Sequence, residues 1–165
     1  MGRKIGFLRS ALHREICHTI LIPSVQTGRA GYSKPELQRL TKRPTNMRLP
    51  GPDHPITITP NPKRVRVSID GMVIADTTHA LTLKEASYPA VQYVPRTDAN
   101  LALMARTDRV THCPYKGDAS YFSVVAGGKT VANAVWTYET PFPAMADIAG
   151  HLAFYPDKVK VEEVA

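Results

Sequence analysis

The segment R-V-R-V-S-I-D-G-M-V-I-A at residues 64–75 carries the clearest structural signal in this 165-residue chain. Valine and isoleucine alternate with arginine and serine over residues 64–69, which is the period-2 pattern of a half-buried β-strand. Asp70-Gly71 follows, and an apolar run over residues 72–75 comes directly after it. Because Asp-Gly between two such runs favours a tight turn, the segment predicts a β-hairpin.

Further short strands are expected on both sides of this hairpin. Gly127-Gly128 separates two apolar runs and predicts a second hairpin. Asp98 or Asn100 is expected to cap a brief helical turn over residues 101–104. Prolines over residues 50–62 predict an extended entry segment with Ile56 and Ile58 on one side. The remaining strands are expected at residues 81–83, 91–94, 121–125, 130–136, 151–155 and 159–161. Many short strands with few helical windows predict a mainly β protein, an antiparallel barrel or sandwich.

The composition excludes several classes of protein. A hydrophobic fraction of 43% and a charged fraction of 21% are typical of a soluble globular domain. No apolar run approaches the roughly 20 residues that a membrane-spanning helix needs. The two cysteines, Cys17 and Cys113, form no C-x-x-C pair, so neither a disulfide framework nor a four-thiolate zinc site is expected. We therefore expect a cytoplasmic protein with free thiols, no metal and no cofactor.

The basic residues are concentrated at the N-terminus. Residues 1–48 hold ten basic and two acidic residues, so they account for the whole formal net charge of +7 and the remainder is close to neutral. We divide the chain into a basic extension over residues 1–46, expected to be poorly ordered, and a single domain over residues 47–165. The extension also resembles a transit-like segment, or translated sequence upstream of an initiator at Met47. Nucleic-acid association is expected, if at all, only through this extension.

A second segment, T-H-C-P-Y-K-G-D-A-S-Y at residues 111–121, gathers reactive groups. Cys113 is a candidate nucleophile if a nearby ammonium lowers its pKa, and the alternative is a buried, inert thiol. Lys116 is a candidate anion-binding group, with Asp118 as its solvent-facing ion-pair partner. Tyr115 lies between the thiol and the amine in the sequence and is a candidate wall for a ligand.

Two other segments offer candidate binding residues. In Y-V-P-R-T-D at residues 93–98, Arg96 is a natural clamp for an anion, or it forms a surface pair with Asp98. In N-A-V-W-T-Y-E at residues 133–139, Trp136 and Tyr138 share one face of the expected strand, so they belong to the core or to the wall of a pocket. Glu139 follows at the strand end, where a general base could stand.

Six motifs in the same order strongly resemble the domain-of-unknown-function family numbered 427. They are G-P-D-H-P-I at 51–56, I-A-D at 74–76, Y-x-P-R-x-D at 93–98, T-x-C-P-Y-K-G-D-A-S-Y at 111–121, N-A-V-W-T-Y-E at 133–139 and F-Y-P-D-K-V at 154–159. The resemblance implies a β-tent architecture, as in zinc-binding exchange-factor-like proteins and B-type methionine sulfoxide reductases. This chain lacks the paired cysteines of that group, so we carry over neither the zinc nor the reductase activity. The family carries a nucleotidyltransferase-like label, but this sequence contains no paired-carboxylate metal site or phosphate-binding loop that would support that activity.

These observations lead to one functional expectation and two alternatives. We expect a polar pocket for a small anionic ligand, and the same residues suit an enzyme and a binding protein. The alternatives are a non-catalytic structural or protein-interaction module, and nucleic-acid association through the extension. The candidate residues are Arg96 and Lys116 for charge, Tyr93, Tyr115 and Trp136 for the walls, and Cys113, Asp118 and Glu139 for acid–base or nucleophilic chemistry.

Overall fold

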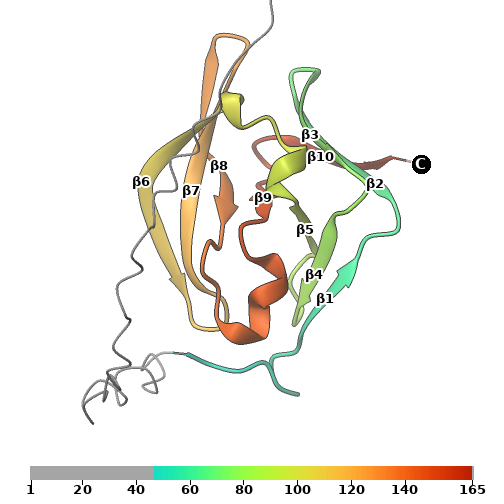
Figure 1. Ribbon diagram of the computed structural model, residues 1–165, viewed down its shortest axis with the longest axis vertical. Coiled ribbons are helices and arrows are strands. Elements are labelled where there is room, and N and C mark those ends of the chain that lie inside the picture. The colour runs from blue at the N-terminus through green and yellow to red at the C-terminus, as the bar shows by residue number, and fades with distance from the viewer. Residues whose placement is uncertain (1–46, 165) are drawn as a thin grey trace, which may run out of the picture. The chain divides into compact units, whose positions relative to one another are not determined.

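A computed structural model describes residues 47–164, which form ten β-strands and three short 3-10 helices (Figure 1). The extension predicted over residues 1–46, with its expected disorder and nucleic-acid role, lies outside the described residues. The strands are β1 (Ile56–Pro60), β2 (Arg64–Ile69), β3 (Met72–Thr77), β4 (Leu81–Glu85), β5 (Val91–Val94), β6 (Met104–Cys113), β7 (Gly117–Ala126), β8 (Lys129–Thr137), β9 (Leu152–Phe154) and β10 (Lys160–Val164). The helices are η1 (Arg96–Asp98), η2 (Leu101–Leu103) and η3 (Pro143–Ile148).

The strands form two antiparallel sheets. The large sheet has seven strands in the order β1-β4-β5-β9-β8-β7-β6, and the small sheet has three in the order β10-β2-β3. In Figure 1, β6, β7 and β8 form one side of the large sheet and β1, β4 and β5 the other, with β9 between them. The prediction of a mainly β, antiparallel domain is confirmed, and the sheets do not close into a barrel. The finer β-tent assignment stays a prediction.

The large sheet has two faces of different character, because successive residues of a strand point to opposite sides. One face packs against the small sheet, and the main core holds buried side chains from both: Val65, Val67, Val94, Phe122 and Val135. The residues next to three of these in the sequence belong to a second cluster on the opposite face: Tyr93, Tyr121 and Trp136. Met145 and Ile148 of η3 are buried in that second cluster. The large sheet thus presents aromatic rings on the face turned away from the main core.

Both predicted hairpins are confirmed. Asp70 and Gly71 join β2 to β3 with φ values of 47° and 82°. Gly127 and Gly128 join β7 to β8 with φ values of 58° and 74°. Two consecutive left-handed residues are the backbone of the tight turn that matches the twist of antiparallel strands, which explains the glycines and the aspartate at these positions.

Strand β6 was not predicted from the sequence. Its residues are mostly exposed, because β6 is an edge strand of the large sheet and only β7 pairs with it. Arginine, aspartate, threonine and histidine therefore fill positions where a central strand would alternate apolar and polar residues. The helical turn after Asn100 is confirmed as η2, and the Asn100 side chain accepts a hydrogen bond from the Ala102 amide. No helix in residues 47–164 has the length and apolar composition that a membrane span requires.

Candidate functional site

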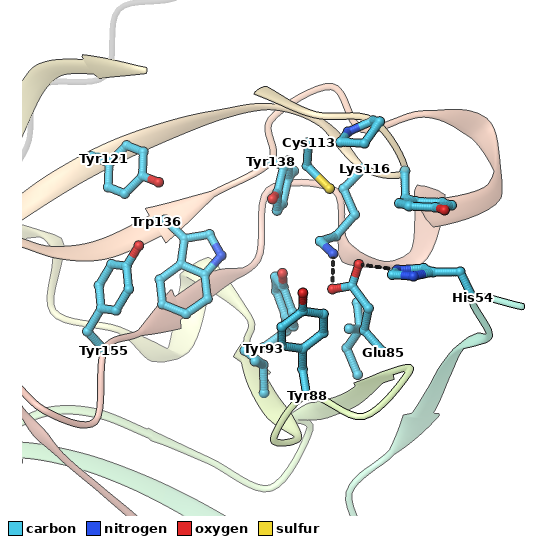
Figure 2. Close-up of a pocket in the computed structure, with 14 residues that line it drawn as sticks. His54, Glu85, Tyr88, Tyr93, Cys113, Lys116, Tyr121, Trp136, Tyr138 and Tyr155 are labelled. Carbon is cyan, nitrogen blue, oxygen red and sulfur yellow. Dashed lines mark hydrogen bonds and ion pairs between the residues drawn. The ribbon is translucent and has the colours of Figure 1, made fainter. Parts of the chain in front are cut away.

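A cavity of about 430 Å³ lies on the aromatic face of the large sheet (Figure 2). Six of the seven tyrosines of the chain and its single tryptophan line it: Tyr88, Tyr93, Tyr115, Tyr121, Tyr138, Tyr155 and Trp136. These residues come from β5, β7, β8 and the loops beside them, so the cavity depends on the assembled sheet.

A row of directly paired residues across four strands builds the floor of this face. Tyr121 of β7 pairs with Trp136 of β8, Trp136 pairs with Ala153 of β9, and Ala153 pairs with Tyr93 of β5. Ala153 is fully buried and carries only a methyl group, so it occupies little of the space between the larger rings on both sides. The Trp136 and Tyr93 rings meet edge to face with centroids 6.5 Å apart. A small residue between two large ones therefore leaves the hollow above the sheet.

The polar end of the cavity is an ion pair between Lys116 and Glu85. The Lys116 ammonium donates a hydrogen bond to one carboxylate oxygen of Glu85, and their side chains are 8% and 18% exposed. His54 Nε2 lies 3.0 Å from the other carboxylate oxygen. The His54 ring in turn stacks on Tyr115, with centroids 4.0 Å apart and an interplanar angle of 6°. One carboxylate thus connects two positively chargeable groups from distant parts of the chain.

Lys116 is directed inward by the turn between β6 and β7. Its amide donates a hydrogen bond to the Cys113 carbonyl at 3.3 Å, and its carbonyl accepts one from the Phe142 amide at 3.0 Å. Gly117 follows with a φ of 103°, a conformation that side-chain-bearing residues rarely adopt. The turn therefore fixes the backbone on both sides of the lysine and holds its side chain in the cavity wall.

The environment controls the protonation of the groups in the cavity. Burial acts to raise the pKa of Glu85, but the hydrogen bonds from Lys116 and His54 hold that pKa below its usual value. Burial raises the pKa of Tyr93 and Tyr138 far above the usual tyrosine value, and it raises the pKa of Tyr155 to about 12. At neutral pH these tyrosines are protonated hydroxyls that can donate and accept hydrogen bonds. Figure 2 shows the hydroxyls of Tyr93 and Tyr138 directed toward the same space as the Lys116 amine.

The structure brings five of the eight predicted site residues together. Cys113, Tyr93, Tyr115, Lys116 and Trp136 line the cavity. Cys113 is a half-buried free thiol in the wall. The other three, Arg96, Asp118 and Glu139, are not among the lining residues. The expectation that Arg96, Lys116 and Glu139 converge on one cavity is therefore wrong.

Arg96 and Glu139 belong to a separate surface cluster. Glu139 accepts two hydrogen bonds from Arg106, at 2.8 and 3.0 Å, and lies 3.7 Å from the Arg96 guanidinium. Both guanidiniums also lie over the Phe122 ring, at 5.2 and 5.9 Å from its centroid. The hydrogen bonds from Arg106 hold the pKa of Glu139 below its usual value, so this carboxylate is a weaker base than a free glutamate.

The expected pair between Lys116 and Asp118 is also wrong. Asp118 lies 2.6 Å from Nδ1 of His112, and its side chain is 73% exposed. Gly117 separates the two residues, and its left-handed conformation turns the chain between them. Lys116 therefore pairs with the carboxylate of Glu85 on β4, which is 31 residues away in the sequence.

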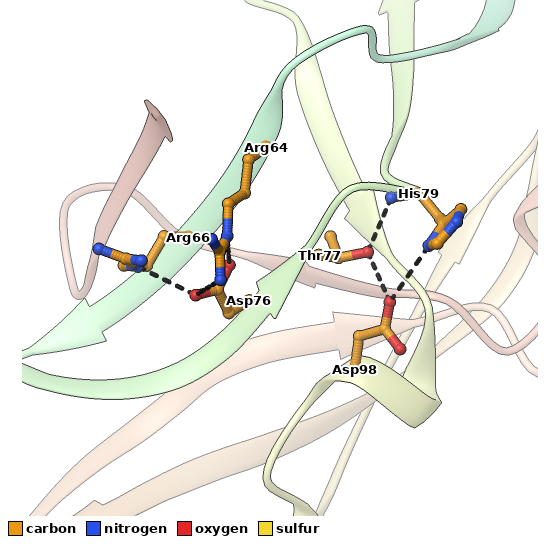
Figure 3. A network of polar contacts seen from close by, with 6 residues as sticks. All are labelled: Arg64, Arg66, Asp76, Thr77, His79 and Asp98. Carbon is orange, nitrogen blue, oxygen red and sulfur yellow. Dashed lines mark hydrogen bonds and ion pairs between the residues drawn. The ribbon is translucent and has the colours of Figure 1, made fainter. Parts of the chain in front are cut away.

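Asp98 belongs to a polar network beside β2 and β3 (Figure 3). Strand β5 ends before Pro95, and η1 directs Asp98 to Thr77, whose hydroxyl donates a hydrogen bond of 2.6 Å. The surface pair between Arg96 and Asp98 is therefore not formed. In the same network, Asp76 accepts hydrogen bonds from Arg64 at 2.6 and 2.9 Å and from Arg66 at 3.1 Å. These ion pairs link β2 to β3, so we assign them a role in stabilising the small sheet.

Sequence reasoning missed Glu85 and His54 as members of the site. Glu85 ends an ordinary amphipathic strand, and nothing near it in the sequence points to Lys116. His54 lies in the G-P-D-H-P-I motif, which carried the resemblance without indicating a role for the ring. Within residues 47–164, no group of three or more histidine, cysteine, aspartate or glutamate side chains could hold a metal ion.

The comparisons with known proteins agree with the resemblance. The model of a family described as "Domain of unknown function (DUF427)" matches residues 57–165. This range includes every residue that lines the cavity except His54. No curated protein matches the chain.

Proposed function

We propose that this domain, which belongs to the DUF427 family of unknown function, binds a small planar ligand in the cavity. The polar edge of that ligand reaches Lys116 and Glu85, and its flat faces contact the aromatic walls. Concave sites with mostly aromatic walls and a few convergent polar groups are typical of small-molecule binding.

The gathering of tyrosines around one cavity is the observation that supports this proposal most. A cluster that served stability alone would fill its interior with aliphatic side chains in close contact. Here the polar ends of Tyr93 and Tyr138 face a space of about 430 Å³ beside a buried ion pair. Protonated hydroxyls at fixed positions suit the recognition of a ligand with hydrogen-bonding groups at its edge.

The charge of the polar end favours an uncharged ligand edge. Lys116 already shares its charge with Glu85, and the predicted second cation, Arg96, is not part of the lining. A carboxylate ligand would accept from Lys116 but would place its charge beside Glu85. An amide-like edge can accept a hydrogen bond from Lys116 and donate one to Glu85 without breaking the pair. The anionic ligand predicted from the sequence stays the alternative.

Two other proposals remain from the sequence. If the domain is an enzyme, Cys113 is the predicted catalytic residue that lines the cavity, whereas Asp118 and Glu139 lie outside its lining. If the domain is a structural or protein-interaction module, no small molecule should bind the cavity. We also propose a cytoplasmic location, on the basis of the composition and the free thiols.

The proposal can be tested with a matched pair of probes, benzamide and benzoate. The full chain contains one tryptophan, so its tryptophan emission reports on Trp136 in the cavity wall. We expect benzamide to bind more tightly than benzoate at neutral pH. In Glu85→Gln, benzamide should bind more weakly because the acceptor loses its charge, and benzoate more tightly because the repulsion is removed.

A broader screen by thermal unfolding should accompany the titration and include nucleotides, sugar phosphates and organic acids. If the wild type prefers benzoate and Glu85→Gln does not change this preference, the anionic alternative is correct. If no compound in either experiment changes the emission or the unfolding temperature, the binding function is wrong and the structural module is favoured.

A further inference from the structure

A second cavity, of about 630 Å³, lies beside the first and shares part of its wall. The shared residues are Glu85, Tyr88, Val91, Trp136 and Tyr155. Because one set of side chains borders both spaces, an occupant of either cavity contacts the wall of the other. The two cavities are therefore neighbours on the same part of the large sheet.

We propose that the ligand is elongated, with a planar polar head in the first cavity and an apolar tail in the second. This inference rests on the binding function proposed above and adds the chemical class of the ligand. The first cavity supplies hydrogen bonds through Lys116, Glu85 and the tyrosine hydroxyls. The second supplies apolar surface, so the two ends of the ligand differ in polarity.

The part of the second cavity that lies away from the shared wall is mostly apolar. It is lined by five apolar residues, Pro89, Ala90, Phe154, Pro156 and Val161, and by three polar ones, Gln92, Glu162 and Glu163. All three polar side chains already have partners within the protein, and the Glu162 carboxylate lies 2.5 Å from the Lys160 amine. The Glu163 carboxylate accepts hydrogen bonds from the Lys63 amine at 2.8 Å and from the side-chain amide of Asn61 at 2.9 Å. The Gln92 side chain accepts from the same Asn61 amide at 3.0 Å and from the Thr82 hydroxyl at 2.8 Å. A hydrocarbon chain therefore fits this space better than a polar one.

The junction between the cavities is aromatic. The Trp136 ring lies against Tyr155, with centroids 4.5 Å apart and an interplanar angle of 47°. Tyr88 borders the same junction from the turn between β4 and β5, and it is 65% exposed although it is a large aromatic residue. A ligand that extends from one cavity into the other would lie against these aromatic rings at the point where its planar head continues into its tail. The aromatic junction therefore favours one ligand across both cavities over two separate ligands.

The test compares benzamide with 4-pentylbenzamide on the full chain, again through Trp136 emission. If the pentyl group enters the second cavity, the affinity should rise at least about tenfold, because each buried methylene contributes roughly a fourfold gain when fully desolvated. The variant Ala90→Glu places a charge in the second cavity, at an exposed position before β5. The control Ala102→Glu places the same charge at an exposed position outside both cavities.

We expect Ala90→Glu to remove most of the gain from the pentyl group while benzamide binds as in the wild type, and Ala102→Glu to change neither affinity. If benzamide binds but the pentyl group gives no gain, or if the gain survives in Ala90→Glu, the elongated ligand is wrong and the proposed binding function stands. If neither probe changes the emission, the elongated ligand is wrong, and the thermal-unfolding screen described above decides whether the binding function stands.

Discussion

Removing the charge of Glu85 should destabilise the domain in a pH-dependent way. Glu85→Gln keeps the size of the side chain and its capacity to accept a hydrogen bond. It removes the negative charge that faces the Lys116 ammonium, and it changes the contact with His54, whose Nε2 lies 3.0 Å away. The variant therefore leaves a cation in the cavity wall with a neutral partner.

The expected cost follows from the burial of the pair. The side chains of Lys116 and Glu85 are only 8% and 18% exposed, so water replaces the lost charge poorly. Leaving a buried charge without any partner costs about 3–5 kcal/mol. Because the glutamine oxygen still accepts from Lys116 and the site is not fully closed, we expect a loss of about 1–3 kcal/mol at neutral pH.

The pH dependence has a definite sign. The folded protein holds the pKa of Glu85 below its usual value of 4.5, so the unfolded chain binds more protons at this site. The stabilisation by Glu85 is therefore present above pH 4.5 and is lost as the pH falls through the lower pKa of the folded state. The difference between the wild type and Glu85→Gln should be largest near neutral pH and should shrink in acid.

Urea unfolding followed by tryptophan emission, at about pH 7 and about pH 4, measures this difference. A matched control is Asp70→Asn, which removes a carboxylate from an ion pair with Lys129 whose side chains are 68% and 70% exposed. Exposed pairs contribute about 0–1 kcal/mol, so this control should cost little. The reasoning is refuted if Glu85→Gln costs no more than the control, or if its cost is the same at both pH values.

Two further variants separate the cavity from its surroundings. Ala153→Leu puts a larger side chain between Tyr93 and Trp136, with which Ala153 pairs, so it should cost about 1–3 kcal/mol by overpacking and should weaken benzamide binding at least about tenfold. Urea unfolding and emission titration measure the two effects, and unchanged binding would contradict the proposal that a small residue between the two rings keeps the cavity open. Glu139→Gln changes only the surface cluster with Arg106, so it should lower the free energy of unfolding by under about 1 kcal/mol and leave benzamide binding unchanged. Weaker benzamide binding in the same titration would show that Glu139 contributes to the binding site.

The sequence predicted those features that depend on local chain geometry. The period-2 pattern of a strand predicted that Trp136 and Tyr138 share one face, and both line the same cavity. The two hairpins formed where Asp70-Gly71 and Gly127-Gly128 supply left-handed residues. In these places the conformation of a few adjacent residues determines the outcome, so the local pattern is sufficient.

The misplaced features depend on contacts between distant segments. Lys116 pairs with Glu85 through the assembled sheet, and no spacing along the chain reports that contact. Arg96 was expected in the cavity as a clamp for an anion, and Glu139 as a general base at the end of a strand. Both lie beyond a strand end, where the alternation of faces no longer holds. Strand β6 was missed because its main contacts are backbone pairs with β7, which leave little trace in its composition.

The position of β9 in the large sheet has a consequence for how the chain folds. This three-residue strand, Leu152–Phe154, lies between β5 and β8 and joins two groups of strands that pair among themselves. Each group is held by pairings among its own strands, and β9 is the strand of the large sheet that pairs with both. Because Tyr93 comes from one group and Trp136 from the other, we expect the binding cavity to form only when β9 has inserted between β5 and β8.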